Sequence, residues 1–290
     1  MTVYPNVKLN LGLRVLGRRP DGYHSLESLF VPWDGFRDEL SVEPADGFGI
    51  EIGGPCYRGW DPSEDLTARA WRLMRDEFGI GPARIHLTKN SPVGAGLGGG
   101  SADGAFALRA LSDLFGLGLS EDTFAALAAR LGSDCPFFIY NRPMFVSGRG
   151  EVLEPFDIDL SAYRIEVAVP EGVAVSTREA YVGLDVQGEA VASEPVPAVP
   201  ASLPTCGWAP PSNSAEGGMP LGGNTSTLRE VLRLPVPSWR GRLVNDFERS
   251  VFPAHPEIPA LKEEFYRRGA VYSAMSGSGS AVFALFPANI

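Results

Sequence analysis

The segment from Val7 to Val15 alternates strictly between apolar residues and other residues. A period of two places alternate side chains on opposite faces of a β-strand, so we predict a half-buried strand here. Lys8 and Asn10 share its polar face, which in an ordinary strand is solvated. Similar patterns predict strands at 23–30, 38–43, 48–52, 83–88, 163–169 and 282–286, and a strand-like apolar run that follows Gly132 and reaches Ile139.

Between these strands lie segments in which apolar residues recur at helical spacing. Ser63 is a candidate N-cap for a helix that ends near Phe78, and Ser120 is a candidate cap for the helix at 121–130. A third helix covers 105–115, with Ser101 or Asp103 as its candidate cap. Shorter helices are predicted at 176–182 and 258–268.

Five glycines lie within the seven residues from Gly94 to Gly100. Glycine lacks Cβ, so such a turn can adopt positive φ angles and bring backbone N–H groups close to a ligand. A helix begins where the glycines stop, and its N-terminus presents unsatisfied N–H donors and the positive end of the helix dipole. The combination favours phosphate binding.

Other interpretations of the glycines remain open from these residues alone. The segment lacks the Lys-Ser or Lys-Thr of a Walker loop, but Gly94, Gly96 and Gly99 fit the dinucleotide-binding pattern G-x-G-x-x-G. That pattern is expected near an opening strand, with an acidic residue about 20 positions later. A flexible linker is not usually flanked by a strand and a strong helix. A non-Walker phosphate loop is the favoured hypothesis.

Charge and composition exclude several classes of protein. A net charge of −10 argues against binding DNA or another polyanion, since that affinity comes from many lysine and arginine contacts. Cys56, Cys135 and Cys206 are few, odd in number and widely spaced, which argues against a disulfide framework or a zinc site. No apolar run approaches the roughly 18–20 residues of a membrane span, and no signal-peptide profile follows Met1. We therefore expect a cytoplasmic protein with no membrane partner.

The region from about 185 to 225 differs from the rest of the chain. Prolines there are interspersed with serine, glycine and alanine. This composition predicts a long irregular excursion on the surface, and it matches no motif.

Three motifs follow one another along the chain: Pro5-Asn6-Val7-Lys8-Leu9-Asn10-Leu11, the glycine loop from Pro92 to Ser101, and Met275-Ser276-Gly277-Ser278-Gly279-Ser280. In this order and at this separation they resemble the galactokinase, homoserine kinase, mevalonate kinase and phosphomevalonate kinase superfamily, the GHMP kinases. The resemblance spans nearly the whole chain. It implies an α+β fold with an ATP-binding domain at 1–155 like ribosomal protein S5 domain 2, a ferredoxin-like domain at 156–290, and an active site in the cleft between them.

Four shorter motifs are similar to one group within this superfamily. They are Asp21-Gly22-Tyr23-His24, the triple glycine with Ser101, the run from Leu131 to Phe138, and Gly148-Arg149-Gly150-Glu151. That group transfers the γ-phosphoryl group of ATP to the 2-hydroxyl of 4-diphosphocytidyl-2-C-methyl-D-erythritol, in the non-mevalonate isoprenoid pathway. The resemblance therefore implies an ATP-dependent kinase for that small molecule. Mg²⁺ would be bound mainly by ATP oxygens, and no protein residue is assigned as its ligand.

The resemblance also implies catalytic roles. Asp134 would accept the hydroxyl proton, while Lys8 would keep Asp134 ionised and stabilise charge on the transferring group. Asn10 would hydrogen-bond the substrate near the reacting hydroxyl. Without the resemblance, a lone Asp beside a turn is more often a cap or turn residue, and a lysine on a strand face is more often solvated.

The acceptor contacts are also implied by the resemblance. Tyr23 and His24 would read the cytosine by stacking and by hydrogen bonds to the base edge. Tyr181 would supply a second aromatic wall, with Thr177 and the backbone at Arg149 near the cytidine or diphosphate. The alternative is a core tyrosine and a solvated histidine.

The remaining implied contacts are to ATP. Asp65, Leu66 and Lys89 resemble the adenosine-contacting segments, and the triphosphate would lie along Pro92, Gly94, Ala95, Gly96, Leu97, Gly98, Gly99, Gly100 and Ser101. Two positions depart from the family: Asp65 stands where Asn is usual, and Ala102 replaces a second serine.

Two other functions remain as alternatives. One is a different GHMP kinase, acting on mevalonate or homoserine, which carry no cytosine for Tyr23 and His24 to read. The other is a non-catalytic nucleotide-binding protein of the same fold, against which the presence of both Lys8 and Asp134 argues. The sequence does not indicate an oligomeric state.

Overall fold

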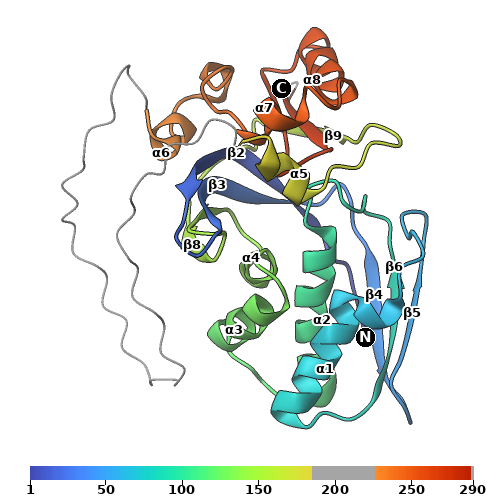
Figure 1. Cartoon of the computed structure of the whole chain (residues 1–290). Helices are drawn as coiled ribbons and strands as arrows, with labels where there is room; N and C mark the ends of the chain where they lie inside the picture. Colours follow the sequence, from blue (N-terminus) through green and yellow to red (C-terminus); the bar gives the residue numbers. More distant parts are fainter. Residues whose placement is uncertain (185–225, 289–290) are drawn as a thin grey trace, which may run out of the picture.

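The computed structural model describes residues 1–184 and 226–288. The predicted proline-rich excursion at 185–225 therefore lies outside the described residues. Three sheets carry the fold, with the first two built from the N-terminal half and the third from the C-terminal half (Figure 1).

The first sheet has the strand order β1-β4-β6-β5. Its strands are β1 Thr2–Val3, β4 Glu39–Pro44, β5 Gly49–Gly53 and β6 Ala83–Thr88. β5 and β6 are parallel and are joined through α1, whereas the other neighbours are antiparallel. A parallel pair needs such a crossover connection, so this βαβ unit brings the start of α1 beside the end of β5.

Helices cover this sheet and enclose the first core. They are η1 Pro62–Glu64, α1 Leu66–Phe78, α2 Gly99–Phe115, α3 Glu121–Leu131 and α4 Cys135–Tyr140. α1 and α2 lie side by side against the sheet, and α3 and α4 follow on the other side of α2 (Figure 1). Leu40, Met74, Ile85 and Phe137 are fully buried in this core.

The second sheet has the order β2-β3-β7-β8, and the third has the order β10-β11-β9. Their strands are β2 Val7–Arg18, β3 His24–Trp33, β7 Met144–Ser147, β8 Val152–Pro155, β9 Tyr163–Ala168, β10 Tyr272–Met275 and β11 Val282–Pro287. The helices of the C-terminal half are α5 Thr177–Val182, α6 Leu228–Leu232, η3 Val236–Ser238, α7 Phe247–Val251 and α8 Glu257–Arg267.

One apolar cluster joins the second and third sheets. It contains Leu9 of β2, Leu29 of β3, Tyr272 of β10 and Phe283 of β11, all at most 1% exposed. Trp239, just after η3, packs edge-on against Tyr272 with ring centroids 5.4 Å apart. The two halves of the chain thus share a core at their junction.

The prediction of a half-buried strand at β2 is wrong. Lys8 is 4% exposed and Asn10 is 1% exposed, although both lie on the polar face. The glycine loop pairs with the edge of β2, where the Lys8 N–H donates to the Leu97 carbonyl at 2.9 Å. It also covers the Lys8 side chain, since a Cβ on Gly98 would lie 3.1 Å from Lys8 Cγ. Ser276, from the turn after β10, covers it further along, where its Oγ accepts the Asn10 N–H at 3.2 Å.

Two predicted helix starts are also corrected. Asp65, not Ser63, caps α1, since its carboxylate accepts the Thr67 N–H at 2.9 Å. Neither Ser101 nor Asp103 caps α2, which begins after Gly98 in a left-handed conformation with no side-chain cap.

The strand-like run after Gly132 is a helix, α4. Five consecutive buried residues, Cys135 to Ile139, explain the error, because a short element buried on all sides shows no periodicity. Within the part of the chain that the structure describes, no helix has both the length and the apolar character needed to cross a membrane.

Candidate active site

A cleft of about 540 Å³ lies where the two halves of the chain meet. It is lined by β2, the glycine loop and the turn before α4 from the first half, and by residues of α5, α7 and the turn after β10 from the second. Most of the predicted site residues line it: Lys8, Asn10, Asp65, Leu66, Lys89, Pro92, Gly94, Ala95, Gly96, Leu97, Gly98, Gly99, Gly100, Ser101, Asp134, Arg149, Thr177 and Tyr181. Tyr23 and His24 are not among the lining residues.

Lys8 and Asp134 face each other in this cleft. Lys8 Nζ lies 3.7 Å from Asp134 Oδ2, and Asp134 remains 31% exposed while Lys8 is buried. The ammonium also lies over the Phe30 ring, 4.4 Å from its centroid, and donates to Asn10 Oδ1. Burial lowers the pKa of Lys8 below its usual 10.5, and the Asp134 carboxylate partly opposes this shift.

Asp134 is held by the start of α4. It is the N-cap residue of that helix, but its side chain makes no capping hydrogen bond, so the carboxylate is available to the cleft. The next residue, Cys135, is buried, and burial raises the pKa of its thiol to about 12. Cys135 is therefore protonated and packs as a small apolar residue.

The glycine loop combines two kinds of glycine. Gly94, Gly96 and Gly98 have φ angles of 70°, 76° and 72°, a region that favours glycine. At Gly96 a Cβ would also lie 2.1 Å from the Ser276 carbonyl oxygen, so the close approach of the two turns requires glycine there. At Gly94 and Gly100, by contrast, a Cβ would meet nothing within 4 Å.

The open space beside Gly94 and Gly100 adjoins the uncapped N-terminus of α2. The first turn of a helix has free N–H donors, and no side chain takes up the cap position here. Because α2 is 17 residues long, its dipole adds a positive potential at this end. The residues therefore fit the triphosphate of a nucleotide.

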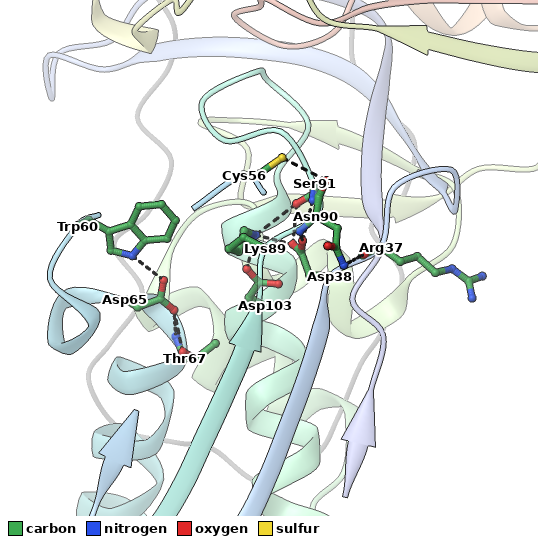
Figure 2. A network of polar contacts seen from close by, with 10 residues as sticks. All are labelled: Arg37, Asp38, Cys56, Trp60, Asp65, Thr67, Lys89, Asn90, Ser91 and Asp103. Atoms are coloured by element: carbon green, nitrogen blue, oxygen red, sulfur yellow. Dashed lines mark hydrogen bonds and ion pairs between the residues drawn. The ribbon is translucent and has the colours of Figure 1, made fainter. Parts of the chain in front are cut away.

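Lys89 lies beside Gly99, at the start of α2, in a buried network of charges (Figure 2). Its ammonium donates to Asp38 Oδ2, to Asp103 Oδ2 at 2.5 Å and to Ser91 Oγ at 3.2 Å. These contacts use all three ammonium protons, so the ammonium has no N–H donor left for a nucleotide. A direct contact of Lys89 with ATP stays a prediction. In this arrangement, the methylene groups of the side chain would make that contact.

The two carboxylates of this network are not equivalent. Asp38 also accepts the N–H groups of Asn90 and Ser91 at 2.6 and 2.7 Å, which stabilise its charge. Asp103 Oδ1 is buried and has no partner. Burial therefore raises the pKa of Asp103 well above its usual range, whereas the two carboxylates raise the pKa of Lys89.

Asp65, the N-cap residue of α1, also bonds an aromatic side chain (Figure 2). One oxygen accepts from Thr67, and the other accepts the Trp60 indole N–H at 3.1 Å. Trp60 also lines the cleft and packs edge-on against Tyr57. Both Asp65 oxygens thus have partners within the protein, and its adenine contact stays a prediction.

The predicted cytosine readers lie at the rim of the cleft. The Arg149 guanidinium lies over the Tyr23 ring, 5.0 Å from its centroid. The His24 ring stacks on Tyr181 at 4.7 Å with an interplanar angle of 17°. Each reader is thus paired with a predicted residue that does line the cleft. Tyr23 is 59% exposed, which rules out a core tyrosine.

Several lining residues were not predicted from the sequence. Trp60, Asp103, Val175, Phe247, Gly277 and Ser278 belong to this group. Ser278 Oγ lies 3.2 Å from Thr177 Oγ1, so the turn after β10 reaches α5 across the cleft. The second glycine turn was the available signal for Gly277 and Ser278, but no motif marks Trp60 or Phe247.

Comparisons with known proteins agree with this geometry. The family model for the N-terminal domain of GHMP kinases matches residues 65–142, and the model for the C-terminal domain of GHMP kinases matches residues 228–289. Curated proteins named 4-diphosphocytidyl-2-C-methyl-D-erythritol kinase from Parabacteroides distasonis and Nitratidesulfovibrio vulgaris are 41% and 39% identical to the chain. Each alignment covers 99% of this chain, and 92% and 90% of those proteins.

Solved structures lead to the same family. The crystal structure of a 4-(cytidine 5'-diphospho)-2C-methyl-D-erythritol kinase superposes with a TM-score of 0.70 at 31% identity, covering 98% of this chain and 90% of that one. A homoserine kinase from Cytophaga hutchinsonii has a TM-score of 0.61 at 16% identity, with 99% and 86% covered, and shows the fold alone.

These findings confirm the predicted α+β GHMP kinase fold and the predicted small-molecule kinase class, whose members use ATP. The domain boundary at residue 155 stays a prediction. The chain belongs to the GHMP kinases, in the family of 4-diphosphocytidyl-2-C-methyl-D-erythritol kinases.

Proposed function

We propose that this protein transfers the γ-phosphoryl group of ATP to the 2-hydroxyl of 4-diphosphocytidyl-2-C-methyl-D-erythritol. The observation that carries this proposal is that the Lys8–Asp134 pair and the glycine loop lie together in one cleft, with the His24–Tyr181 stack and the Arg149–Tyr23 contact at its rim. Relatives of that name align with 99% of the chain.

Asp134 is the proton acceptor in this proposal. Its carboxylate is partly exposed and free of capping bonds, so an acceptor hydroxyl can reach it. Lys8 lies 3.7 Å away and stabilises the ionised carboxylate and the negative charge on the transferring group. Phosphoryl transfer demands mostly positioning and charge stabilisation, which this pair supplies.

The glycine loop and the N-terminus of α2 hold the triphosphate, because they offer backbone N–H donors and open space beside Gly94 and Gly100. Mg²⁺, bound mainly to ATP oxygens, would neutralise phosphate charge. Trp60, Leu66 and Lys89 also line the cleft, and the adenosine would lie beside them.

The rim recognises the cytidine. Tyr23 and His24 offer aromatic rings to the base, and stacking on an aromatic side chain contributes about 1–3 kcal/mol per base. Arg149 and Tyr181 contact these two rings, while Thr177 and Asn10 line the cleft. Mevalonate and homoserine carry no base for such a rim.

The deciding experiment measures ADP release by the purified protein with Mg-ATP and the cytidylated acceptor. Mevalonate and homoserine serve as competing acceptors, and Asp134→Asn serves as the inactive control, with kcat lowered about 10²–10⁴-fold if Asp134 accepts the proton. Turnover of mevalonate or homoserine without turnover of the cytidylated acceptor would overturn the substrate assignment. Full activity of Asp134→Asn would overturn the proton-acceptor role.

A further inference from the structure

A chain of hydrogen bonds runs from a bulge in β2 to the Lys8 ammonium. The pairing of β2 with β3 shifts between Leu11 and Leu13, and Gly12 between them has a φ of 71°. The Gly12 carbonyl accepts the Ser28 hydroxyl at 2.6 Å. The bulge thus supplies an acceptor that points at a β3 side chain.

Ser28 in turn orients the Asn10 amide. Its hydroxyl has one proton, which it donates to Gly12, so only its lone pairs remain for Asn10. Asn10 Nδ2 donates to Ser28 Oγ at 3.0 Å, and both residues are at most 1% exposed. The amide must therefore turn its Oδ1 away from Ser28.

Asn10 Oδ1 is the atom that meets Lys8. It accepts from Lys8 Nζ and also from Ser276 Oγ at 3.3 Å. If the amide rotated by half a turn, its NH₂ group would face the ammonium, and two donors would meet in a buried site. Ser28 prevents this, although it is not among the residues that line the cleft.

We propose that Ser28 is a positioning residue for phosphoryl transfer, which acts by fixing the orientation of the Asn10 amide that holds the Lys8 ammonium. The proposal rests on the proposed function insofar as Lys8 acts on the transferring group. Ser28 touches no substrate and acts through Asn10 alone.

The groups that face Lys8 determine how its pKa responds when the Asn10 amide is no longer oriented. Asp134, before α4, is the charged group in ion-pair distance among the described residues. Phe30 of β3 presents its ring, the glycine loop presents only backbone, and Asn10 presents an oxygen. A rotated amide would turn that oxygen away from Lys8 and leave Asp134 to oppose the burial that lowers the pKa of Lys8. The alkaline limb of kcat therefore moves to lower pH.

The test compares Ser28→Ala, Ser28→Thr and the control Ser273→Ala. Ser273, on β10, is also buried and donates to the Phe283 carbonyl at 2.9 Å, away from the cleft. Losing a hydrogen bond to a charged group through Ser28→Ala should lower kcat about 10- to 100-fold, with KM for ATP within about twofold. Ser28→Thr keeps the hydroxyl and restores kcat, and Ser273→Ala leaves both constants unchanged.

A second readout does not depend on the substrate. The sequence has only three lysines, Lys8, Lys89 and Lys262, so NMR of the protein with ¹³C-labelled lysine resolves each titration. We expect the Lys8 titration to move to lower pH in Ser28→Ala and to return in Ser28→Thr, while the Lys89 and Lys262 signals stay in place.

An unchanged Lys8 titration and kcat in a folded Ser28→Ala protein would overturn the proposal. Failure of Ser28→Thr to restore kcat would overturn it as well, since packing rather than the hydroxyl would then matter. If the wild-type protein does not phosphorylate the cytidylated acceptor, the proposed function fails, and the lysine titration still decides whether Ser28 positions Lys8.

Discussion

Lys8 is a buried charge that the fold accommodates at a cost. Burial lowers its pKa, so the folded protein binds its proton less tightly than the unfolded chain does. The free energy of unfolding should therefore rise with pH between the folded pKa of Lys8 and the ordinary lysine pKa of 10.5. The proposed role of Lys8 in phosphoryl transfer, rather than the stability of the fold, accounts for a lysine at this place.

We expect Lys8→Met to lose activity without losing stability. Removing the charge from the transition state should lower kcat about 10²–10³-fold. The melting temperature should stay the same or rise, because the buried ammonium is gone and its partner Asp134, which is 31% exposed, remains solvated. Lys262→Met is the matched control: its ammonium pairs with Glu248 at 2.6 Å outside the cleft. The control should keep kcat. A marked fall in the melting temperature of Lys8→Met would contradict this account.

The Lys89 network predicts opposite effects on stability for removing its ammonium and for neutralising one of its carboxylates. Lys89→Met leaves two buried carboxylates without an ammonium and should lower the free energy of unfolding by about 3–5 kcal/mol. Asp103→Asn keeps an acceptor for Lys89 and removes the carboxylate whose pKa burial raises, so it should leave stability at neutral pH unchanged or higher.

The pH dependence gives the sign of the Asp103 effect. The folded protein holds the Asp103 proton at higher pH than the unfolded chain, whose carboxyl titrates near 3.8. Stability thus falls as pH rises from about 3.8 through the folded pKa. Denaturant titrations should show this fall weakened in Asp103→Asn, and equal pH slopes in both proteins would contradict the assignment.

At the scale of elements, the glycine loop was the clearest signal in the sequence, and its partners were the least visible. Glycine density predicted the turn and a helix after it, although α2 already begins at Gly99, and apolar spacing predicted α1, α3 and α8. The alternation of β2 was interpreted correctly as a strand but not as a buried one, because what covers its polar face comes from residues about 90 and 270 positions away in the sequence. No local pattern encodes such contacts.

Gly96 and Gly100 should respond differently to alanine. Gly96→Ala puts a methyl group against the Ser276 carbonyl at a positive φ, which should destabilise the protein by at least about 1–2 kcal/mol. Gly100→Ala lies in helical backbone with free space, so stability should rise by up to about 1 kcal/mol. Its methyl group would enter the proposed triphosphate site and raise KM for ATP. An unchanged KM would show that no phosphate approaches Gly100.

For the whole molecule, the order of motifs along the chain predicted the fold class, since that order carried the resemblance to GHMP kinases. The cleft itself required the structure. Trp60 and Phe247 reach it from loops and helices that no motif marks, and the bonding of Lys89 and Asp65 within the protein follows from side-chain directions that sequence spacing does not give.

The apolar cluster shared by β2, β3, β10 and β11 has a consequence for unfolding. Neither half can lose its structure without exposing side chains of the other, so the folded chain should melt as one cooperative unit. Calorimetry should give a single transition whose van't Hoff and calorimetric enthalpies agree, and two separated transitions would contradict this expectation. By the same reasoning, residues 1–155 expressed alone should aggregate, since Leu9 and Leu29 would face water.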